Sequence, residues 1–203
     1  MKIFCIGRNY AEHAKEMNSA VPDEPLIFMK PPTALVQEGK PIYYPDFTKS
    51  LHYECELVLK IGKNGKSISE QYAMDYVSEL TLGIDFTARD LQAELKKKGH
   101  PWEIAKAFDN SAPVGKFLPA NEVNNWNDLT FDLTVNGETK QTGHTEHLIF
   151  SIPYLIKYIS HRFTLQKGDL IFTGTPEGVG EVHVGDKLVA SFEGEEVLNF
   201  EVK

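Results

Sequence analysis

The sequence has only two cysteines and contains no long apolar run. Two cysteines cannot form a disulfide framework, and both stand among apolar residues, as small buried side chains often do, so we expect a reducing compartment. No apolar stretch approaches the roughly 20 residues that cross a bilayer, which predicts no membrane span. The apolar stretch before Arg8 is too short for the core of a secretory signal. We therefore expect a cytoplasmic protein without a membrane partner.

Basic residues are also few. The chain has 21 Lys and Arg residues against 29 Asp and Glu residues, which gives a formal net charge of −8. This field repels phosphate backbones and anionic lipids, which argues against nucleic acid as a partner. The same field repels small anionic metabolites. A site for such a metabolite would need a local cation or a cluster of basic side chains.

Turn residues divide the sequence into short strands and a few helices, without an internal repeat or a low-complexity segment. Apolar patterning predicts strands at residues 3–7, 26–29, 52–61, 80–87, 131–135, 169–172, 187–192 and 197–202. Helical periodicity predicts helices at residues 10–17, 69–80 and 152–160. Strands outnumber helices, and regular β-α alternation is absent. The sequence therefore predicts one domain, residues 1–203, with a mixed α+β, β-rich fold.

A further helix is expected after residue 87. Thr87 to Asp90 has the spacing of a capping box, and Gly99 suits the end of a helix whose last turn is rich in lysine. Residues three apart lie on the same side of a helix, so Arg89 and Gln92 should share one face.

Three carboxylates stand at alternating positions of two predicted strands. Glu54 and Glu56 share one face of strand 52–61, and Asp85 faces away from the core in strand 80–87. Together they could complete a site of oxygen donors only, which selects Mg²⁺ or Mn²⁺ over Zn²⁺. A Glu-x-Glu pair in an alternating strand is more often a solvated face. Spacing alone leaves both interpretations open.

A histidine and a glutamate stand three residues apart on the first predicted helix. The side chains of His13 and Glu16 can therefore meet, and the carboxylate could orient the imidazole and raise its basicity. Such a pair would be a general base. An exposed helix face with an incidental pair is the alternative.

Residues 173–180 form a glycine-rich segment after a predicted apolar strand, with Thr173, Gly174 and Thr175 at its start. Such a loop can aim backbone N–H groups at a carboxylate, although a purely structural turn is the alternative. The segment matches neither the dinucleotide fingerprint nor the P-loop. The chain also lacks Gly-x-Ser-x-Gly, and neither cysteine has a nucleophile's surroundings, so a covalent acyl-enzyme is poorly supported.

Taken in order, five motifs resemble the fumarylacetoacetate hydrolase superfamily, and most closely its short members that act as acylpyruvases and oxaloacetate decarboxylases. The resemblance extends from residue 3 to about residue 200. The motifs are Gly7-Arg8-Asn9-Tyr10, His52-x-Glu54-x-Glu56-Leu57, Gly83-x-Asp85-x-Thr87-Ala88-Arg89-Asp90-x-Gln92, Lys106-x-Phe108 and Gly174-Thr175-Pro176-x-Gly178-Val179-Gly180.

The resemblance implies a coiled β-roll with a few short helices, usually a homodimer, and a Mg²⁺ or Mn²⁺ ion. By this correspondence the metal ligands are Glu54, Glu56 and Asp85. Residues 8–20 are implied to form a mobile lid helix. The implied catalytic residues are His13, Glu16, Lys106 and Gln92. The implied substrate-binding residues are Arg89, Thr175, Lys30 and Gly174.

Two departures from the family pattern bear on the substrate. The chain lacks the extra N-terminal domain of the larger members, which argues against fumarylacetoacetate itself. Residues 144–147, His-Thr-Glu-His, stand where the resemblance leads us to expect small polar residues. These histidines either tune specificity at the pocket rim or are simply exposed.

The resemblance implies a small 2-oxo acid as substrate, and Arg89 and Lys106 would supply the local positive charge that such an anion needs. Our first hypothesis is hydrolysis of the C–C bond of an acylpyruvate to pyruvate and a carboxylic acid. His13 paired with Glu16 would activate the water, and Gln92 or the Thr175 loop would help bind the oxyanion. The alternatives on the same site are oxaloacetate decarboxylation, oxaloacetate keto-enol tautomerisation and 2-hydroxy-diene-dioate isomerisation. A non-catalytic protein that binds an oxo acid is the more distant alternative.

Overall fold

The computed structural model describes residues 1–17, 19–36 and 40–203. Within these ranges two sheets carry most of the strands. The larger sheet contains, in spatial order, β2 (Leu26–Lys30), β1 (Ile3–Gly7), β12 (Leu170–Phe172), β5 (Cys55–Ile61), β6 (Val77–Ile84) and β9 (Leu118–Pro119). The second sheet contains β11 (Glu138–His144), β10 (Thr130–Val135), β14 (Lys187–Phe192) and β15 (Glu195–Glu201).

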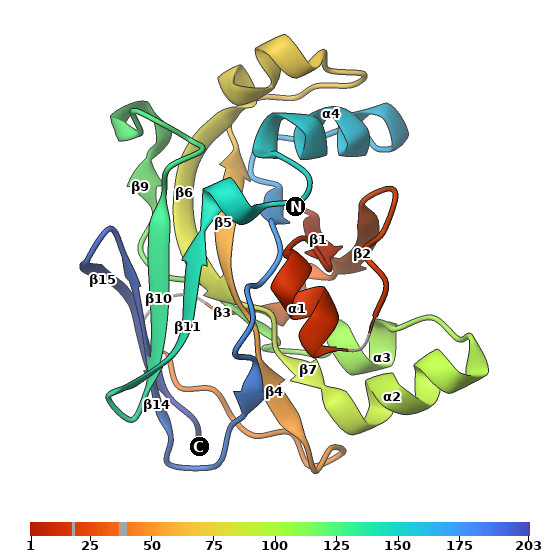
Figure 1. Cartoon of the computed structure of the whole chain (residues 1–203), viewed down its shortest axis with the longest axis vertical. Coiled ribbons are helices and arrows are strands. Elements are labelled where there is room, and N and C mark those ends of the chain that lie inside the picture. The colour runs from red at the N-terminus through yellow and green to blue at the C-terminus, as the bar shows by residue number, and fades with distance from the viewer. Residues whose placement is uncertain (18, 37–39) are drawn as a thin grey trace.

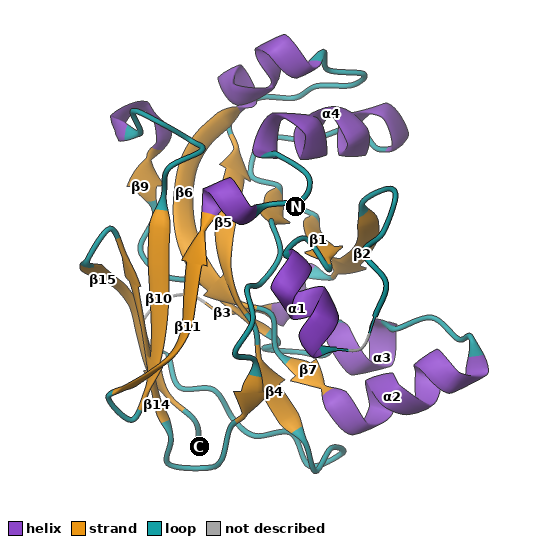
Figure 2. Cartoon of the chain, in the orientation of Figure 1, coloured by secondary structure: helices purple, strands orange, loops and turns teal. Residues whose placement is uncertain are grey.

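Shorter strands and helices complete the fold. The small sheets pair β13 (Gly180–Glu181), β4 (Leu51–Tyr53) and β7 (Thr87–Ala88), and separately β3 (Leu35–Val36) and β8 (Ala112–Pro113). The α-helices are α1 (Ala11–Glu16), α2 (Arg89–Lys98), α3 (Glu103–Lys106) and α4 (Ile152–Arg162). Short 3₁₀ turns cover Pro32–Ala34, Glu70–Tyr76, Ala120–Glu122 and Thr145–His147. The predicted β-rich α+β fold is confirmed, and Figure 2 shows strands predominating over short helices.

The main core lies between the two large sheets. In Figure 1 the four-stranded sheet stands on the left, the helices α1 to α4 on the right, and β5 and β6 between them. Leu57 and Leu59 of β5 are fully buried in one cluster with Leu133 of β10 and Leu188 of β14. Burial of each such side chain contributes about 1.5–3 kcal/mol. The opposite face of β5 is covered as well, because Val58 packs with residues of β1 and β12.

Pairing between strands that are distant in sequence places the N-terminal strand in the interior of the larger sheet. β1 pairs in parallel with β12, with Ile3 opposite Leu170, and antiparallel with β2. Cys5 of β1 and Cys55 of β5 are free and buried, which confirms their expected packing. No helix in the described ranges is long and apolar enough to cross a bilayer.

The prediction of a helix at residues 69–80 was wrong in its second half. The 3₁₀ turn Glu70–Tyr76 is followed directly by β6, where Leu80 lies opposite Leu59 of β5. Cross-strand burial of these leucines outweighs the local helical pattern. Strand β11 and helix α3 were not predicted, because β11 is mostly polar and α3 is a single turn.

The predicted capping box at Thr87 and Asp90 was also wrong. Ala88 precedes α2 without a side-chain cap, and the Thr87 hydroxyl donates to the Asp85 carbonyl at 3.3 Å. Asp90 instead accepts from the Thr48 hydroxyl at 2.6 Å, which ties the loop before β4 to the start of α2. The helix does end at Gly99, whose φ of 65° is left-handed.

Candidate metal and substrate site

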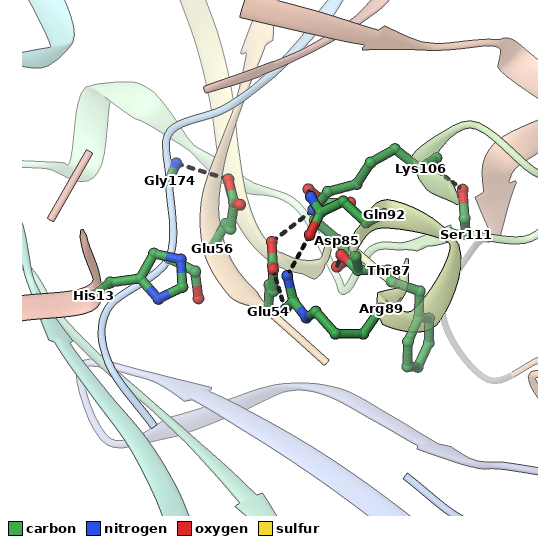
Figure 3. Close-up of polar contacts among 12 residues, drawn as sticks. His13, Glu54, Glu56, Asp85, Thr87, Arg89, Gln92, Lys106, Ser111 and Gly174 are labelled. Atoms are coloured by element: carbon green, nitrogen blue, oxygen red, sulfur yellow. Dashed lines mark hydrogen bonds and ion pairs between the residues drawn. The ribbon is translucent and has the colours of Figure 1, made fainter. Parts of the chain in front are cut away.

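The three carboxylates predicted from strand alternation meet at the junction of β5 and β6. Glu54 precedes β5, Glu56 lies in it, and the Asp85 N–H that follows β6 donates to the Glu54 carbonyl at 2.8 Å. One carboxylate oxygen from each of the three lies within 4.8 Å of the others. Glu54 is 6% exposed, Glu56 2% and Asp85 0%, so the interpretation as a solvated face was wrong. Figure 3 shows the three carboxylates converging.

Three buried or nearly buried cations neutralise this cluster. Lys106 Nζ of α3 lies 2.7 Å from Glu54 Oε2 and 2.7 Å from Asp85 Oδ2. Arg89 Nη2, at the start of α2, lies 2.5 Å from Glu54 Oε1. Lys30 Nζ, at the end of β2, lies 2.8 Å from Asp85 Oδ1. That ion pair is outside hydrogen-bond angles, so Oδ1 has no hydrogen-bond partner among the described residues.

The pKa values of Glu54 and Glu56 shift in opposite directions because the cations are unevenly placed. Burial alone would raise the pKa of Glu54, but Lys106 and Arg89 hold it below its ordinary value. Burial raises the pKa of Glu56 well above the ordinary range, and the charges of Asp85 and Glu54 raise it further. A hydrogen bond of 2.7 Å from the Gly174 N–H opposes this shift. Of the three carboxylates, Glu56 therefore has the negative charge that nearby cations balance least.

These residues fit a hard divalent cation. Three converging carboxylates offer only oxygen donors, the ligands that Mg²⁺ and Mn²⁺ prefer. Oδ1 of Asp85, which has an ion pair with Lys30 but no hydrogen bond among the described residues, and the poorly compensated Glu56 are the groups that a cation would satisfy. Glu54, Glu56 and Asp85 would hold the ion, as predicted.

A cavity opens onto the carboxylates and is unusually rich in basic side chains for this acidic chain. Besides the three carboxylates, Gln92 and Thr175 line it, together with the apolar Phe28 and Trp102. The basic residues in its wall are Arg8, His13, Arg89, Lys96 and Lys106. The predicted need for a cluster of basic side chains is therefore met.

Arg8 and Lys96 were missed as wall residues. Arg8 has a φ of 58°, a left-handed conformation that costs free energy for a residue with a side chain and is frequent at functional sites. Lys96 follows Arg89 and Gln92 at helical spacing on α2. Burial lowers the pKa of Lys96, and the charges of Arg89 and Arg8 lower it further. The helical spacing was a usable signal for Lys96.

The predicted pair on the first helix forms. His13 Nδ1 lies 3.2 Å from Glu16 Oε2, and His13 is 6% exposed in the cavity wall. The other oxygen of Glu16 accepts the Gly178 N–H at 3.0 Å. If Nδ1 carries the proton toward Glu16, Nε2 is left as the basic nitrogen. In Figure 3 His13 lies on the Glu56 side of the cluster. Residue 18 of the predicted lid segment 8–20 lies outside the described residues.

The glycine-rich loop aims its backbone at a protein carboxylate rather than into the cavity. Gly174 has a φ of 107°, and a Cβ there would lie 2.6 Å from Cβ of Asn9. The Asn9 amide in turn donates to the Thr173 carbonyl at 2.8 Å. The Thr175 hydroxyl donates to the Cys55 carbonyl at 2.8 Å, so the threonine is held in place where it lines the cavity.

Of the remaining predicted residues, Gln92 lines the cavity and the others do not. Gln92 Oε1 accepts from Arg89 Nη1 at 2.8 Å, which confirms the shared helical face. Lys30 and Gly174 are not among the residues that line the cavity. Lys30 is buried behind Asp85 and donates to the Ser111 hydroxyl at 2.9 Å, because the end of β2 lies beneath that carboxylate. His144 and His147 also lie outside the lining.

Comparison with known proteins identifies the family. The model of the fumarylacetoacetate (FAA) hydrolase C-terminal family matches residues 2–203. The chain belongs to the fumarylacetoacetate hydrolase family and is an enzyme of that family. The predicted family and fold are confirmed.

Particular relatives cover most of the chain. Oxaloacetate tautomerase FAHD1 of Mus musculus, named as mitochondrial, is 49% identical over 201 residues, 99% of this chain and 91% of its own. A fumarylpyruvate hydrolase of Pseudomonas aeruginosa, solved with Mn²⁺ and pyruvate, is 42% identical with a TM-score of 0.94 over 100% of this chain and 89% of its own. A 2-hydroxyhepta-2,4-diene-1,7-dioate isomerase from Mycobacterium marinum is 36% identical with a TM-score of 0.86 over 99% and 73%. Tautomerase and isomerase relatives thus support the alternative function at least as well as acylpyruvate hydrolysis.

Proposed function

We propose that the protein is a Mg²⁺- or Mn²⁺-dependent oxaloacetate tautomerase, which interconverts the keto and enol forms of this 2-oxo dicarboxylate. The observation that carries the proposal is the contact of His13 with Glu16, which places a histidine backed by a carboxylate in the wall of a cavity that also holds three converging carboxylates. Tautomerisation needs a base and stabilisation of one developing charge. The relative at 49% identity, named as an oxaloacetate tautomerase, supports this choice over our first hypothesis of acylpyruvate hydrolysis.

The charge around the carboxylate cluster suits an anionic substrate. Three carboxylates and the cations Lys30, Arg89 and Lys106 sum to zero, so a bound divalent cation leaves a net charge of +2. Arg89 and Lys106 then become available to the oxo-acid end of the substrate. Arg8 and Lys96 lie in the same wall and suit the second carboxylate. A dicarboxylate therefore fits this cavity better than a monocarboxylate such as acetylpyruvate.

The chain's own residues supply the proton transfer. The His13 imidazole takes a proton from C3 of oxaloacetate, and the electron pair of the C–H bond moves toward the C2 oxygen. Glu16 stabilises the imidazolium that forms, because its carboxylate lies 3.2 Å from Nδ1. A bound Mg²⁺ or Mn²⁺ supplies stabilisation of the negative charge that develops on oxygen. His13 then returns the proton to oxygen or to carbon, which gives the enol or the keto form.

Acylpyruvate hydrolysis is the second candidate, because the fumarylpyruvate hydrolase is 42% identical and has a TM-score of 0.94. In that reaction His13 would activate a water molecule for attack on the distal carbonyl.

One assay separates these functions. Purified protein with Mg²⁺ is given enol oxaloacetate, and the loss of enol absorbance is followed beside the release of pyruvate. Tautomerase activity consumes the enol faster than buffer does and releases no pyruvate. Fumarylpyruvate and acetylpyruvate are assayed in parallel. If hydrolysis of either exceeds enol conversion in kcat/KM, the tautomerase proposal fails and the second candidate replaces it.

A further inference from the structure

A second group of potential metal ligands stands away from the carboxylate site, where β11 ends. His144 is the last residue of β11, and Glu146 and His147 lie in the 3₁₀ turn that follows. One ligand atom of each of these three residues lies within 4.8 Å of the others. None of them lines the catalytic cavity.

A fourth residue orients the first histidine. Nε2 of His144 lies 3.0 Å from Asp128 Oδ1, while Nδ1 lies 3.5 Å from Glu146 Oε2. A carboxylate on one ring nitrogen fixes the ring and leaves the other nitrogen for an ion, as in most histidine metal sites. The rings of His144 and His147 are 5.4 Å apart between centroids.

The backbone that carries these side chains is fixed before any ion binds. Thr145 is buried, its N–H donates to the Leu129 carbonyl at 3.0 Å, and its hydroxyl accepts the Leu129 N–H at 3.0 Å. Leu129 directly follows Asp128. The Leu129–Thr145 hydrogen bonds therefore fix the position of Asp128 relative to the turn. Less conformational entropy is then lost when an ion binds.

We propose that His144, Glu146 and His147 bind a transition-metal ion of the Zn²⁺ type, with Asp128 as the positioning residue. Two imidazoles and one carboxylate are donors that favour Zn²⁺ over Mg²⁺, in contrast to the oxygen-only cluster of the cavity. The carboxylates of Glu146 and Asp128 supply negative charge beside the ion. The Glu146 side chain is 72% exposed, so the ion enters from solvent and keeps a position open to water.

The test is a titration of the Mg²⁺-saturated protein with Zn²⁺, with the bound metal counted after desalting. The wild type is expected to bind one Zn²⁺ more than His144→Ala/His147→Ala. The matched control is His161→Ala/His183→Ala, which removes two exposed histidines elsewhere and should keep that ion. Repeating the count in a Glu56→Ala background removes the carboxylate site from the comparison. Asp128→Asn should weaken Zn²⁺ about 10- to 100-fold.

Two results would overturn the proposal. One is that the Glu56→Ala protein, with His144 and His147 intact, binds no Zn²⁺. The other is that the wild type and the His144/His147 double variant bind equal amounts of Zn²⁺. Co²⁺ provides a spectroscopic check. Its visible absorption should report nitrogen ligation in the wild type and in the His161/His183 control, and should be lost in the double variant. Tautomerase turnover with Mg²⁺ should be unchanged in that variant, which separates this site from the catalytic one.

Discussion

The backbone N–H of Gly174 donates a hydrogen bond of 2.7 Å to Oε2 of Glu56. Gly174 can approach so closely because it has no Cβ and a left-handed φ of 107°, with Asn9 packed against it. A loop that was predicted to aim backbone N–H groups at a carboxylate thus holds a carboxylate of the protein itself. The position of Glu56 depends on this contact.

Gly174→Ala should weaken Mg²⁺ binding at least about tenfold, because the added Cβ displaces the loop and its N–H from Glu56. The backbone strain should also cost about 1–3 kcal/mol of unfolding free energy. Gly185→Ala is the matched control: its φ is 97°, but nothing lies within 4 Å of an added Cβ. Metal titration and thermal unfolding of both variants measure the two effects. Equal loss of metal affinity in both would contradict the role of the Gly174 contact.

Metal-free protein should become less stable, relative to Glu56→Gln, as pH rises. The folded-state pKa of Glu56 lies above its unfolded value, so the folded state binds more protons between these two pKa values, and ionisation of Glu56 disfavours folding. The difference should grow by up to about 1.4 kcal/mol per pH unit within that window and vanish below the unfolded pKa. Urea unfolding in EDTA at several pH values measures it. A constant difference would be inconsistent with the raised pKa.

Removal of the metal should abolish turnover and lower thermal stability. An ion that binds only the folded state stabilises it by about 2.7 kcal/mol at 100 times its dissociation constant. Mg²⁺ or Mn²⁺ should therefore raise the Tm of the wild type but not of Asp85→Asn, which loses one of the three converging carboxylates. Calorimetric scans with and without EDTA provide the measurement. Full activity in EDTA would refute the metal requirement.

His13→Ala should lower kcat for tautomerisation about 100- to 10,000-fold with little change in KM, as expected for loss of a general base. Glu16→Gln should cost less, because the amide oxygen can still accept the Gly178 N–H. Glu12→Gln is the control on the same helix, since Glu12 pairs with the exposed Lys15. Steady-state kinetics on enol oxaloacetate distinguish the three. Decarboxylation, if present, should survive in His13→Ala, because it needs no attacking water and no proton abstraction.

Lys96→Met should raise KM for oxaloacetate about tenfold or more and leave acetylpyruvate nearly unaffected. Loss of a charge-assisted hydrogen bond to the second carboxylate costs about 1.5–3 kcal/mol, and 1.4 kcal/mol is tenfold. Lys97→Met changes the neighbouring exposed lysine and should be silent. The KM values of both substrates in the two variants show whether Lys96 recognises the second carboxylate. Equal effects on both substrates would mean that Lys96 does not recognise the second carboxylate.

The sequence alone predicts the faces of the strands better than their surroundings. Alternation placed Glu54 and Glu56 on one side, and that placement is confirmed. Their burial could not be predicted, because the groups that cover them come from distant segments: Lys106 is 52 residues from Glu54. The metal-binding role of these residues was predicted from the family resemblance of five motifs in order, because their spacing alone left both interpretations open.

Polar residues with structural duties were the hardest to predict. Strand β11 lacks an apolar pattern because it contributes Gln141, whose side chain accepts the Cys55 N–H at 2.9 Å and donates to the Thr175 hydroxyl at 2.8 Å. Lys30 reads as the end of an ordinary strand, and only the folded chain shows that its ammonium supports Asp85. Such duties depend on tertiary contacts that no local pattern encodes.

Glu16 uses one oxygen to orient His13 and the other to accept the Gly178 N–H. Any outward movement of α1 that breaks the second contact would also carry the base away from the reacting carbon. His13 would then reach the reacting carbon only while α1 covers the substrate. In the open enzyme the base would not exchange the substrate's proton with bulk water. A tautomerase built in this way would return to carbon or oxygen largely the same proton that it removed, a property visible as retained isotope label in the product.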